Sequence, residues 1–434
     1  MAPQPHHHAV QHGCLGLPAP LLPGLGPAPD DADRRGPALL RAAAHGLHAR
    51  PAPPVRPCRP GVRRPGRFPG RPPEDGLRLP ARQRSRRLMI GVGVIGTGGI
   101  GRSHLRAWRL LGATPDGGDV HVVAVGGRPG PPAQSSPLPR YDNWHDLVDD
   151  PAVHVVDVCA PDTRHQEMAE YVLAAGKHLM CEKPLAFAPQ DRARLLADAR
   201  RVATGVCFVY RHLPAAAYAR MLIADGRLGT VTEVRAHYLQ QWALDVPEPS
   251  WRMDGSGAGV LGDLGTHLAD LAAHLIPDFR DAHVTSASSP DFACRATWTT
   301  NTPSGIHGVF DVSRTARGYD NHLRLEVFGT QGTVSFTSLR PDEVTLSLAG
   351  APALGGLVKV DEMTNRAFLE QWWGPGSALG WGDLFLHQAS DMIDLVRGRV
   401  AVTSATLADG CDADALTEAV RRTVHAPVQK AAIP

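Results

Sequence analysis

The chain lacks the features that place a protein in a membrane or in a framework of disulfides. No run of residues approaches the roughly 20 apolar positions that cross a bilayer, so we expect no transmembrane helix. Only 7 of the 434 residues are cysteine, and they are scattered without the spacing of zinc ligands. The start has no basic segment followed by an apolar core, which would mark a secretory signal. We therefore expect a cytoplasmic protein with reduced, buried thiols and no metal site.

Lysine is absent from residues 1–87, and acidic residues are few there. This stretch holds 15 arginines, 5 acidic residues and 18 of the 39 prolines, a density that excludes long helices and central strands. We interpret residues 1–88 as a disordered extension. It could be a natural tail, an arginine-rich targeting segment or the translation of GC-rich DNA from a misplaced start. We favour the last, with Met89 as the initiator. The rest of the chain has a net charge of −8, which argues against nucleic acid as a partner.

The most informative pattern begins directly after this segment. A buried strand, Ile90–Ile95, leads through glycines into a helix from Ile100 to about Leu111. The spacing G-x-G-x-x-G at such a turn is typical of sites for a dinucleotide pyrophosphate. Gly96 permits the tight turn, Gly98 lets the backbone approach the phosphate, and Gly101 lets the helix pack close to the strand. We predict an NAD(P) cofactor that contacts Gly96, Thr97, Gly98, Gly99, Ile100 and Gly101.

A further absence concerns the end of the second strand, Val120–Val125. Dinucleotide-binding domains usually place an acidic residue there to hold the adenosine ribose, but this chain reads Gly126-Gly127-Arg128. Arg128 could pair with a 2′-phosphate or stack on adenine. The pattern therefore favours NADP slightly over NAD. The proline-rich segment Pro129–Pro139 is unsuited to the crossover helix that should follow.

Further along the chain, predicted strands continue to alternate with predicted helices. Two of these later strands are followed by polar segments. Val153–Ala160 is followed by Pro161–His165, and His178–Cys181 is followed by Glu182-Lys183-Pro184. Ligands bind at the carboxyl ends of parallel strands, so both segments belong near the cofactor. With a further strand over 205–210, we predict a doubly wound parallel sheet in a Rossmann domain that spans residues 89–212.

The pattern changes in residues 213–434. A helix over 215–225, a strand over 231–242 and several strands within 282–348 precede a late helix over 383–397. We predict an α+β domain with an open, mostly antiparallel sheet flanked by helices. Asp263 and His267 are four residues apart, so on a helix they share one face. A carboxylate beside an imidazole orients it and raises its basicity, as general base catalysis requires. Alone, this spacing more often marks a helix-capping acid followed by a surface histidine.

In this order and spacing, these segments resemble the Gfo/Idh/MocA oxidoreductases from Ile90 to the C-terminus. The likeness rests on the glycine turn, on Glu182-Lys183-Pro184 and on the pattern Asp263-x-Gly265-x-His267-x-x-Asp270. It implies catalytic roles for Lys183, Asp263 and His267. It also implies a homodimer or homotetramer, and a C-terminal tail that packs on the first domain. The further cofactor contacts that it implies are Arg128, Pro161, Asp162, His165, Glu182, Lys183 and Arg211.

A narrower likeness points to family members that act on sugars and cyclic polyols. It rests on Tyr238–Trp242 and on tryptophans that could stack on sugar rings. The implied substrate contacts are Lys183, Gln240, Trp251, Arg252, Asp263 and His267. We therefore expect hydride transfer between NAD(P) and a secondary alcohol carbon of a sugar, inositol or related polyol. Two alternatives stay open, an NAD-assisted glycoside hydrolase on the same scaffold and a non-catalytic sugar or dinucleotide sensor.

Overall fold

The computed structural model describes residues 89–114, 117–127, 138–246, 253, 257–350, 356–360, 380–401 and 403–425. All of them belong to one compact unit. The predictions for residues 1–88, for Pro129–Pro139 and for Trp251 and Arg252 therefore lie wholly or largely outside the described residues. Within the described part, none of the helices combines the length and the apolar character that a membrane span needs.

The first sheet has six parallel strands in the order β3-β2-β1-β4-β5-β6. The strands are β1 (Ile90–Ile95), β2 (Val120–Gly126), β3 (Arg140–Tyr141), β4 (Val155–Val158), β5 (His178–Cys181) and β6 (Thr204–Val206). All residues of β1 and β4 are buried, as expected for strands covered on both faces. The order changes direction between β1 and β4, which creates the switch point where ligands bind such sheets. The predicted Rossmann fold is confirmed.

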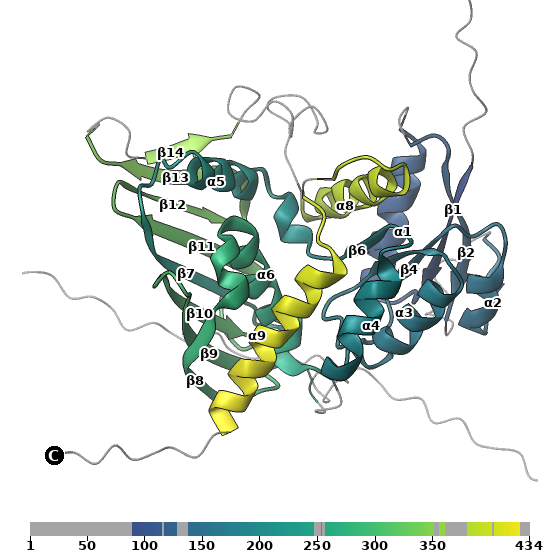
Figure 1. Ribbon diagram of the computed structural model, residues 1–434, viewed down its shortest axis with the longest axis horizontal. Helices are drawn as coiled ribbons and strands as arrows, with labels where there is room; N and C mark the ends of the chain where they lie inside the picture. The colour runs from purple at the N-terminus through teal and green to yellow at the C-terminus, as the bar shows by residue number, and fades with distance from the viewer. Residues whose placement is uncertain are drawn as a thin grey trace, which may run out of the picture. The chain divides into compact units, whose positions relative to one another are not determined.

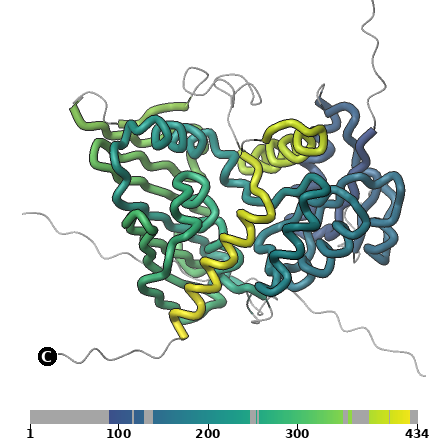
Figure 2. The backbone as a smooth tube through the Cα atoms, in the orientation of Figure 1, coloured from purple at the N-terminus to yellow at the C-terminus, as the bar shows by residue number. Residues whose placement is uncertain are grey.

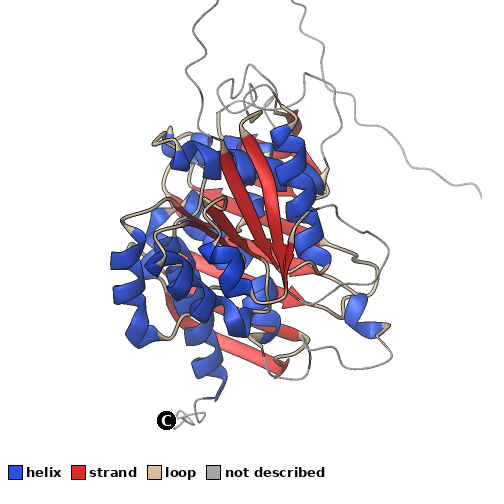
Figure 3. Cartoon of the chain, turned by 90° about the vertical axis from the view of Figure 1, so that its right-hand side faces the viewer, coloured by secondary structure: helices blue, strands red, loops and turns tan. Residues whose placement is uncertain are grey.

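Helices cover both faces of this sheet (Figure 3). Apolar side chains of α1 (Gly99–Gly112) and α8 (Trp381–Val396) pack on one face. The other face is covered by α2 (Trp144–Asp149), α3 (His165–Ala174) and α4 (Pro189–Ala199). Because α8 follows the second sheet in the chain, the C-terminal part returns to the first sheet (Figure 1).

The second sheet has eight strands in the order β14-β13-β12-β11-β7-β10-β9-β8. Its neighbours run antiparallel except β7 and β10, which are parallel. This confirms the predicted mostly antiparallel sheet. The strands are β7 (Val231–Leu239), β8 (His283–Asp291), β9 (Arg295–Asn301), β10 (His307–Ser313), β11 (His322–Gly329), β12 (Gly332–Thr337), β13 (Arg340–Leu348) and β14 (Gly356–Lys359).

One face of the second sheet is covered, and the other is more exposed. In β7, Val234, Ala236 and Tyr238 are buried, while the alternate residues are partly or fully exposed. Helices α5 (Pro214–Ala224) and α6 (Thr266–Leu275) pack against the buried face, where their side chains join one apolar core with the strands.

The last helix, α9 (Leu407–His425), contacts elements of both sheets (Figures 1 and 2). Its Asp414 Oδ2 accepts a hydrogen bond from the backbone N–H of Ala186, 2.8 Å away, just beyond β5. Arg421 donates to the carbonyl of Ala258, 2.7 Å away, in the loop that precedes α6. The helix therefore fixes two loops that carry predicted site residues.

Candidate active site

The glycine turn between β1 and α1 has the steric constraints that a phosphate-binding turn needs. Gly96 has φ of +100°, a conformation that residues with a side chain rarely adopt. A Cβ on Gly101 would lie 1.9 Å from the carbonyl oxygen of Gly96, so only glycine lets α1 approach the strand so closely. Nothing lies within 4 Å of a Cβ placed on Gly98 or Gly99. The backbone of the turn therefore faces open space at the N-terminus of α1.

That space is one end of a pocket of about 1140 Å³ that runs from the first sheet to the second. The glycine turn and the loops after β4 and β5 line one end. The other end is lined by residues from β7, the turn before α6, the segment between β10 and β11, and the start of α8. A pocket of this size can hold a dinucleotide together with a small polar molecule.

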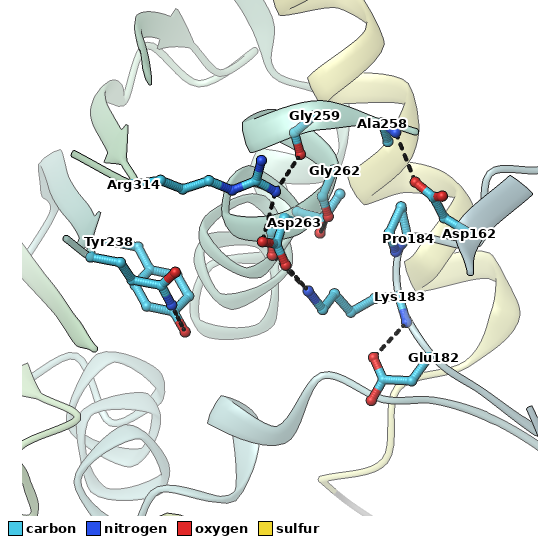
Figure 4. A network of polar contacts seen from close by, with 12 residues as sticks. Asp162, Glu182, Lys183, Pro184, Tyr238, Ala258, Gly259, Gly262, Asp263 and Arg314 are labelled. Carbon is cyan, nitrogen blue, oxygen red and sulfur yellow. Dashed lines mark hydrogen bonds and ion pairs between the residues drawn. The ribbon is translucent and has the colours of Figure 1, made fainter. Parts of the chain in front are cut away.

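Lys183 and Asp263 meet in the middle of the pocket (Figure 4). Lys183 Nζ donates to the main-chain oxygen of Asp263, 2.6 Å away, and to its Oδ1, 3.0 Å away. Arg314, directly after β10, donates from Nη2 to Asp263 Oδ2 at 2.7 Å. Burial would raise the pKa of Asp263, but the charges of Lys183 and Arg314 outweigh it and hold the pKa well below its usual range. Asp263 is thus an ionised carboxylate between two cations.

His267 lines the same pocket but does not pair with Asp263, which corrects the sequence-based expectation. No hydrogen bond joins the two side chains in the described structure, and His267 Nδ1 has no partner among the described residues. Both oxygens of the Asp263 carboxylate are already bonded, Oδ1 to Lys183 and Oδ2 to Arg314. Asp263 lies in a π-helical turn, Leu261–Gly265, in which Thr266 N–H bonds to Leu261 O. Asp263 positions Lys183 instead.

Burial among aromatic rings and a nearby positive charge set the protonation state of His267. Its ring lies edge-on to Tyr210, with centroids 5.0 Å apart, and near Phe208 and Tyr238. Burial, together with the nearby charge of Lys183, lowers the pKa of His267 well below its usual value despite the attraction of Asp263. The imidazole is therefore neutral near pH 7.

A network of polar side chains forms the far end of the pocket. Asn321 Oδ1 accepts from Tyr238 OH at 2.6 Å and from Gln240 Nε2 at 2.8 Å. The Tyr210 and Tyr238 hydroxyls are 2.7 Å apart, and Trp242 Nε1 donates to Gln240 Oε1 at 2.7 Å. Of the residues predicted to contact substrate, Gln240 lines the pocket, whereas Trp251 and Arg252 lie outside the described residues. Sequence analysis missed Asn321 and Arg314, which stand in no recognisable motif.

Two stretches of the chain match known families. Residues 90–210 match an oxidoreductase family with the NAD-binding Rossmann fold, and residues 216–335 match the GFO/IDH/MocA C-terminal domain. A solved oxidoreductase domain protein from Kribbella flavida is 30% identical, with a TM-score of 0.69, and the match covers 78% of this chain and 97% of that one. The chain belongs to the Gfo/Idh/MocA oxidoreductase family. It is therefore an NAD-binding oxidoreductase.

Several characterised relatives within this family act on sugars or polyols. Levoglucosan dehydrogenase of Pseudarthrobacter phenanthrenivorans is 29% identical over 376 residues, which are 76% of this chain and 95% of that protein. A levoglucosan dehydrogenase solved in complex with NADH and levoglucosan has a TM-score of 0.68 and 26% identity, and covers 77% of this chain and 97% of its own. Myo-inositol 2-dehydrogenase of Thermotoga maritima is 25% identical over 273 residues, 59% of this chain and 78% of that protein.

Of the further cofactor contacts implied by the Gfo/Idh/MocA likeness, five line the pocket and Arg211 does not. Pro161 and Asp162 line the pocket, and Asp162 Oδ2 accepts from Ala258 N–H at 2.7 Å (Figure 4). Arg211 takes a different place from the one expected. It is buried in an ion pair with Asp270 and is not among the residues that line the pocket. Arg128 lies outside the described residues.

His165 and Glu182 also line the pocket but have additional structural partners. The ring nitrogens of His165 lie 2.6 and 2.8 Å from the carbonyl oxygens of Pro184 and Ala160. Glu182 Oε1 lies 3.0 Å from His104 Nε2, and the other His104 nitrogen bonds to Asp157 at 2.9 Å. These contacts fix the loops after β4 and β5, and thereby the position of Lys183.

Proposed function

We propose that this enzyme transfers a hydride between a nicotinamide dinucleotide and the secondary alcohol or ketone carbon of a sugar, inositol or related polyol. The observation that carries the proposal is the meeting of Lys183, Asp263 and His267 in the pocket that begins at the glycine turn. The relatives named above, which act on levoglucosan and myo-inositol, support the class of substrate.

The residues around the glycine turn fit the dinucleotide. The N-cap of α1, Gly98, offers no side-chain hydrogen bond, so the first backbone N–H groups of the helix remain for the pyrophosphate. The open space beside Gly98 and Gly99 gives the phosphates room. When bound, the nicotinamide accepts or returns the hydride, and the protein supplies position and proton transfer.

Lys183 binds and polarises the reacting oxygen in this proposal. Of its three N–H donors, two are held by the main-chain oxygen and Oδ1 of Asp263. The third is left for the substrate oxygen. A fixed ammonium at this point stabilises the negative charge that develops on the substrate oxygen as its proton is lost, which prepares the carbon to give up hydride.

His267 accepts the hydroxyl proton in the oxidation direction and returns it in the reverse direction. Its neutral state near pH 7 leaves a ring nitrogen able to take up the proton. Asp263 contributes indirectly, because it positions Lys183 rather than His267. The far end of the pocket supports a polyol substrate, since Gln240, Asn321 and the Tyr238 hydroxyl offer both donors and acceptors there.

The test uses the full chain with NAD and NADP in turn, against levoglucosan, aldoses and inositols. Absorbance of reduced nicotinamide that depends on one of these substrates, and is lost in Lys183→Met, is the expected result. If the chain binds cofactor but reduces none with any substrate, the dehydrogenase proposal fails. Release of an aglycone from a glycoside without net reduction would then identify the glycoside hydrolase alternative, and binding alone would identify a sensor.

Further parts of the proposal concern cofactor choice and organisation. Arg128 favours NADP slightly on sequence grounds, and the adenosine end of the pocket decides between the two cofactors.

We propose domains over 89–212 and 213–434, and a homodimer or homotetramer formed through the more exposed face of the second sheet. Light scattering on the purified chain tests the assembly. The five described cysteines are free thiols, which supports a reducing, cytoplasmic location.

A further inference from the structure

The second strand of the parallel sheet ends without a side chain at the place where dinucleotide-binding sheets usually carry a carboxylate. β2 ends at Gly126, and Gly127 follows with φ of +105°. A Cβ placed on Gly127 would have only backbone atoms of Gly96 within 4 Å, the nearest at 3.5 Å. Space is therefore left beside the glycine turn, at the adenosine end of the pocket.

The neighbouring strand brings a carboxylate to this space. β3 runs parallel to β2, with Tyr141 paired to Gly126, and Gly127 N–H donates to Tyr141 O at 3.3 Å. The next residue, Asp142, therefore lies beside Gly127 at the carboxyl edge of the sheet. Asp142 lines the same pocket as Gly98 and Gly127. Its side chain is exposed, and no described residue forms a hydrogen bond or an ion pair with it.

The polar side chains near Asp142 bond to other groups or lie elsewhere in the pocket, so its carboxylate is available to a ligand. Arg140, two residues earlier, donates from Nη2 to the carbonyl oxygen of Gly127 at 2.5 Å. Asn143, the next residue, caps α2 by accepting from His145 N–H. Arg102 also lines the pocket, but it belongs to the first turn of α1, where the proposed function places the pyrophosphate.

We infer that Asp142 takes the role of the missing β2 carboxylate, binding the adenosine ribose hydroxyls and making the enzyme prefer NAD over NADP. The vicinal 2′- and 3′-hydroxyls of NAD are two donors that suit one carboxylate. The 2′-phosphate of NADP would instead bring a group of charge about −1.5 to −2 against Asp142. This inference deepens the proposed function, and it opposes the NADP preference expected from Arg128.

The experiment measures the Kd of the full chain for NADH and NADPH by fluorescence titration, without any sugar. We expect the native chain to bind NADH more tightly. Asp142→Ala should weaken NADH binding roughly 10-fold or more, because hydrogen bonds to a charged group are lost, and should not weaken NADPH binding. Asp142→Asn keeps the size of the side chain and removes the charge, so it should improve NADPH binding relative to NADH.

Two controls separate this role from general electrostatics. Asp149→Asn removes the same charge from the far end of α2, outside the pocket, and should leave both Kd values unchanged. Arg102→Ala should weaken both cofactors by the same factor, because both carry the pyrophosphate. Tighter NADPH binding by the native chain, or an unchanged NADH-to-NADPH ratio in both Asp142 variants, would overturn the inference. Preferred NADH binding that requires Asp142, without turnover of any polyol, would sustain it while refuting the proposed dehydrogenase function.

Discussion

Replacing Arg314 with methionine tests the electrostatics that keep Asp263 ionised. The Arg314 Nη2 to Asp263 Oδ2 distance is 2.7 Å, so the two charge centres are about 4 Å apart. At an effective dielectric constant of about 20, their attraction is about 4 kcal/mol, or about 3 pKa units. The Asp263 side chain is 26% exposed, and solvent screens part of this interaction. We therefore expect Arg314→Met to raise the pKa of Asp263 by about 2 to 3 units.

The sign of the effect on activity follows from the role of Asp263. Lys183 is held by the ionised carboxylate, so activity is lost as the pH falls through the pKa of Asp263. In the native enzyme this pKa lies well below its usual range, because the charges of Lys183 and Arg314 outweigh burial. Protonation of His267 also removes activity, so the acid limb of kcat/KM reports whichever of the two groups has the higher pKa. The acid limb should therefore move to higher pH in Arg314→Met as the pKa of Asp263 rises past that of His267.

The assay is a pH profile of kcat/KM, recorded by reduced-nicotinamide absorbance. Arg314→Lys keeps the charge and should retain most of the native profile. Arg317→Met is the matched control, because Arg317 is exposed in the same loop and pairs with Asp245 away from Asp263. The reasoning is refuted if the acid limb of Arg314→Met coincides with that of the native enzyme, or if Arg314→Lys shifts it equally.

Three other predictions concern chemistry, substrate binding and stability. Lys183→Met and His267→Ala should each lower kcat at least about 100-fold with NADH binding retained. Near-normal turnover by both variants would show that neither residue takes part in the reaction. Asn321→Ala should raise KM for the polyol roughly 10-fold with little change in kcat; an unchanged KM would place the substrate elsewhere. Burial would lower the pKa of His104, yet its two carboxylate partners raise it to about 10. Protonated His104 therefore stabilises the folded protein below about pH 6.5, and this stabilisation is lost as the pH rises towards 10. An NMR titration of the His104 imidazole with a midpoint near 6.5 would contradict this prediction.

Strands with clear periodicity could be predicted to within a residue or two, as the strands expected over Ile90–Ile95 and Val120–Val125 and found at Ile90–Ile95 and Val120–Gly126 show. The strand expected over 205–210 instead ends at Val206, and a 3-10 turn covers Val209–His212. A short apolar run does not distinguish a buried strand from a buried helical turn. Helix α9 was missed for another reason. Its buried residues include Gly410, Asp414 and Thr417, so it carries no continuous apolar stripe.

Within the site, the residues that could be found from sequence are those that stand in motifs. Lys183 follows a strand in a distinctive segment, and His267 belongs to a recognisable helix pattern. The partners of Asp263 could not be found, because Lys183 and Arg314 come from distant segments and share no spacing pattern with it. Asp142 could not be found from sequence because the usual position of a ribose-binding acid is the end of β2. Only the sheet order shows that the end of β3 reaches the same place.

The direction of one strand pair explains why the substrate end of the pocket was hardest to predict. In a fully antiparallel sheet, neighbouring strands β7 and β10 would end at opposite edges. They are parallel, so Gln240 after β7 and Arg314 after β10 leave at one edge, and Gln240 N–H donates to Ser313 O at 2.7 Å. Strand β11 is antiparallel to β7, so the residue before it, Asn321, joins them at that edge. The alternation of apolar and polar residues is the same for parallel and antiparallel pairing, so no single-sequence pattern brings these three side chains together.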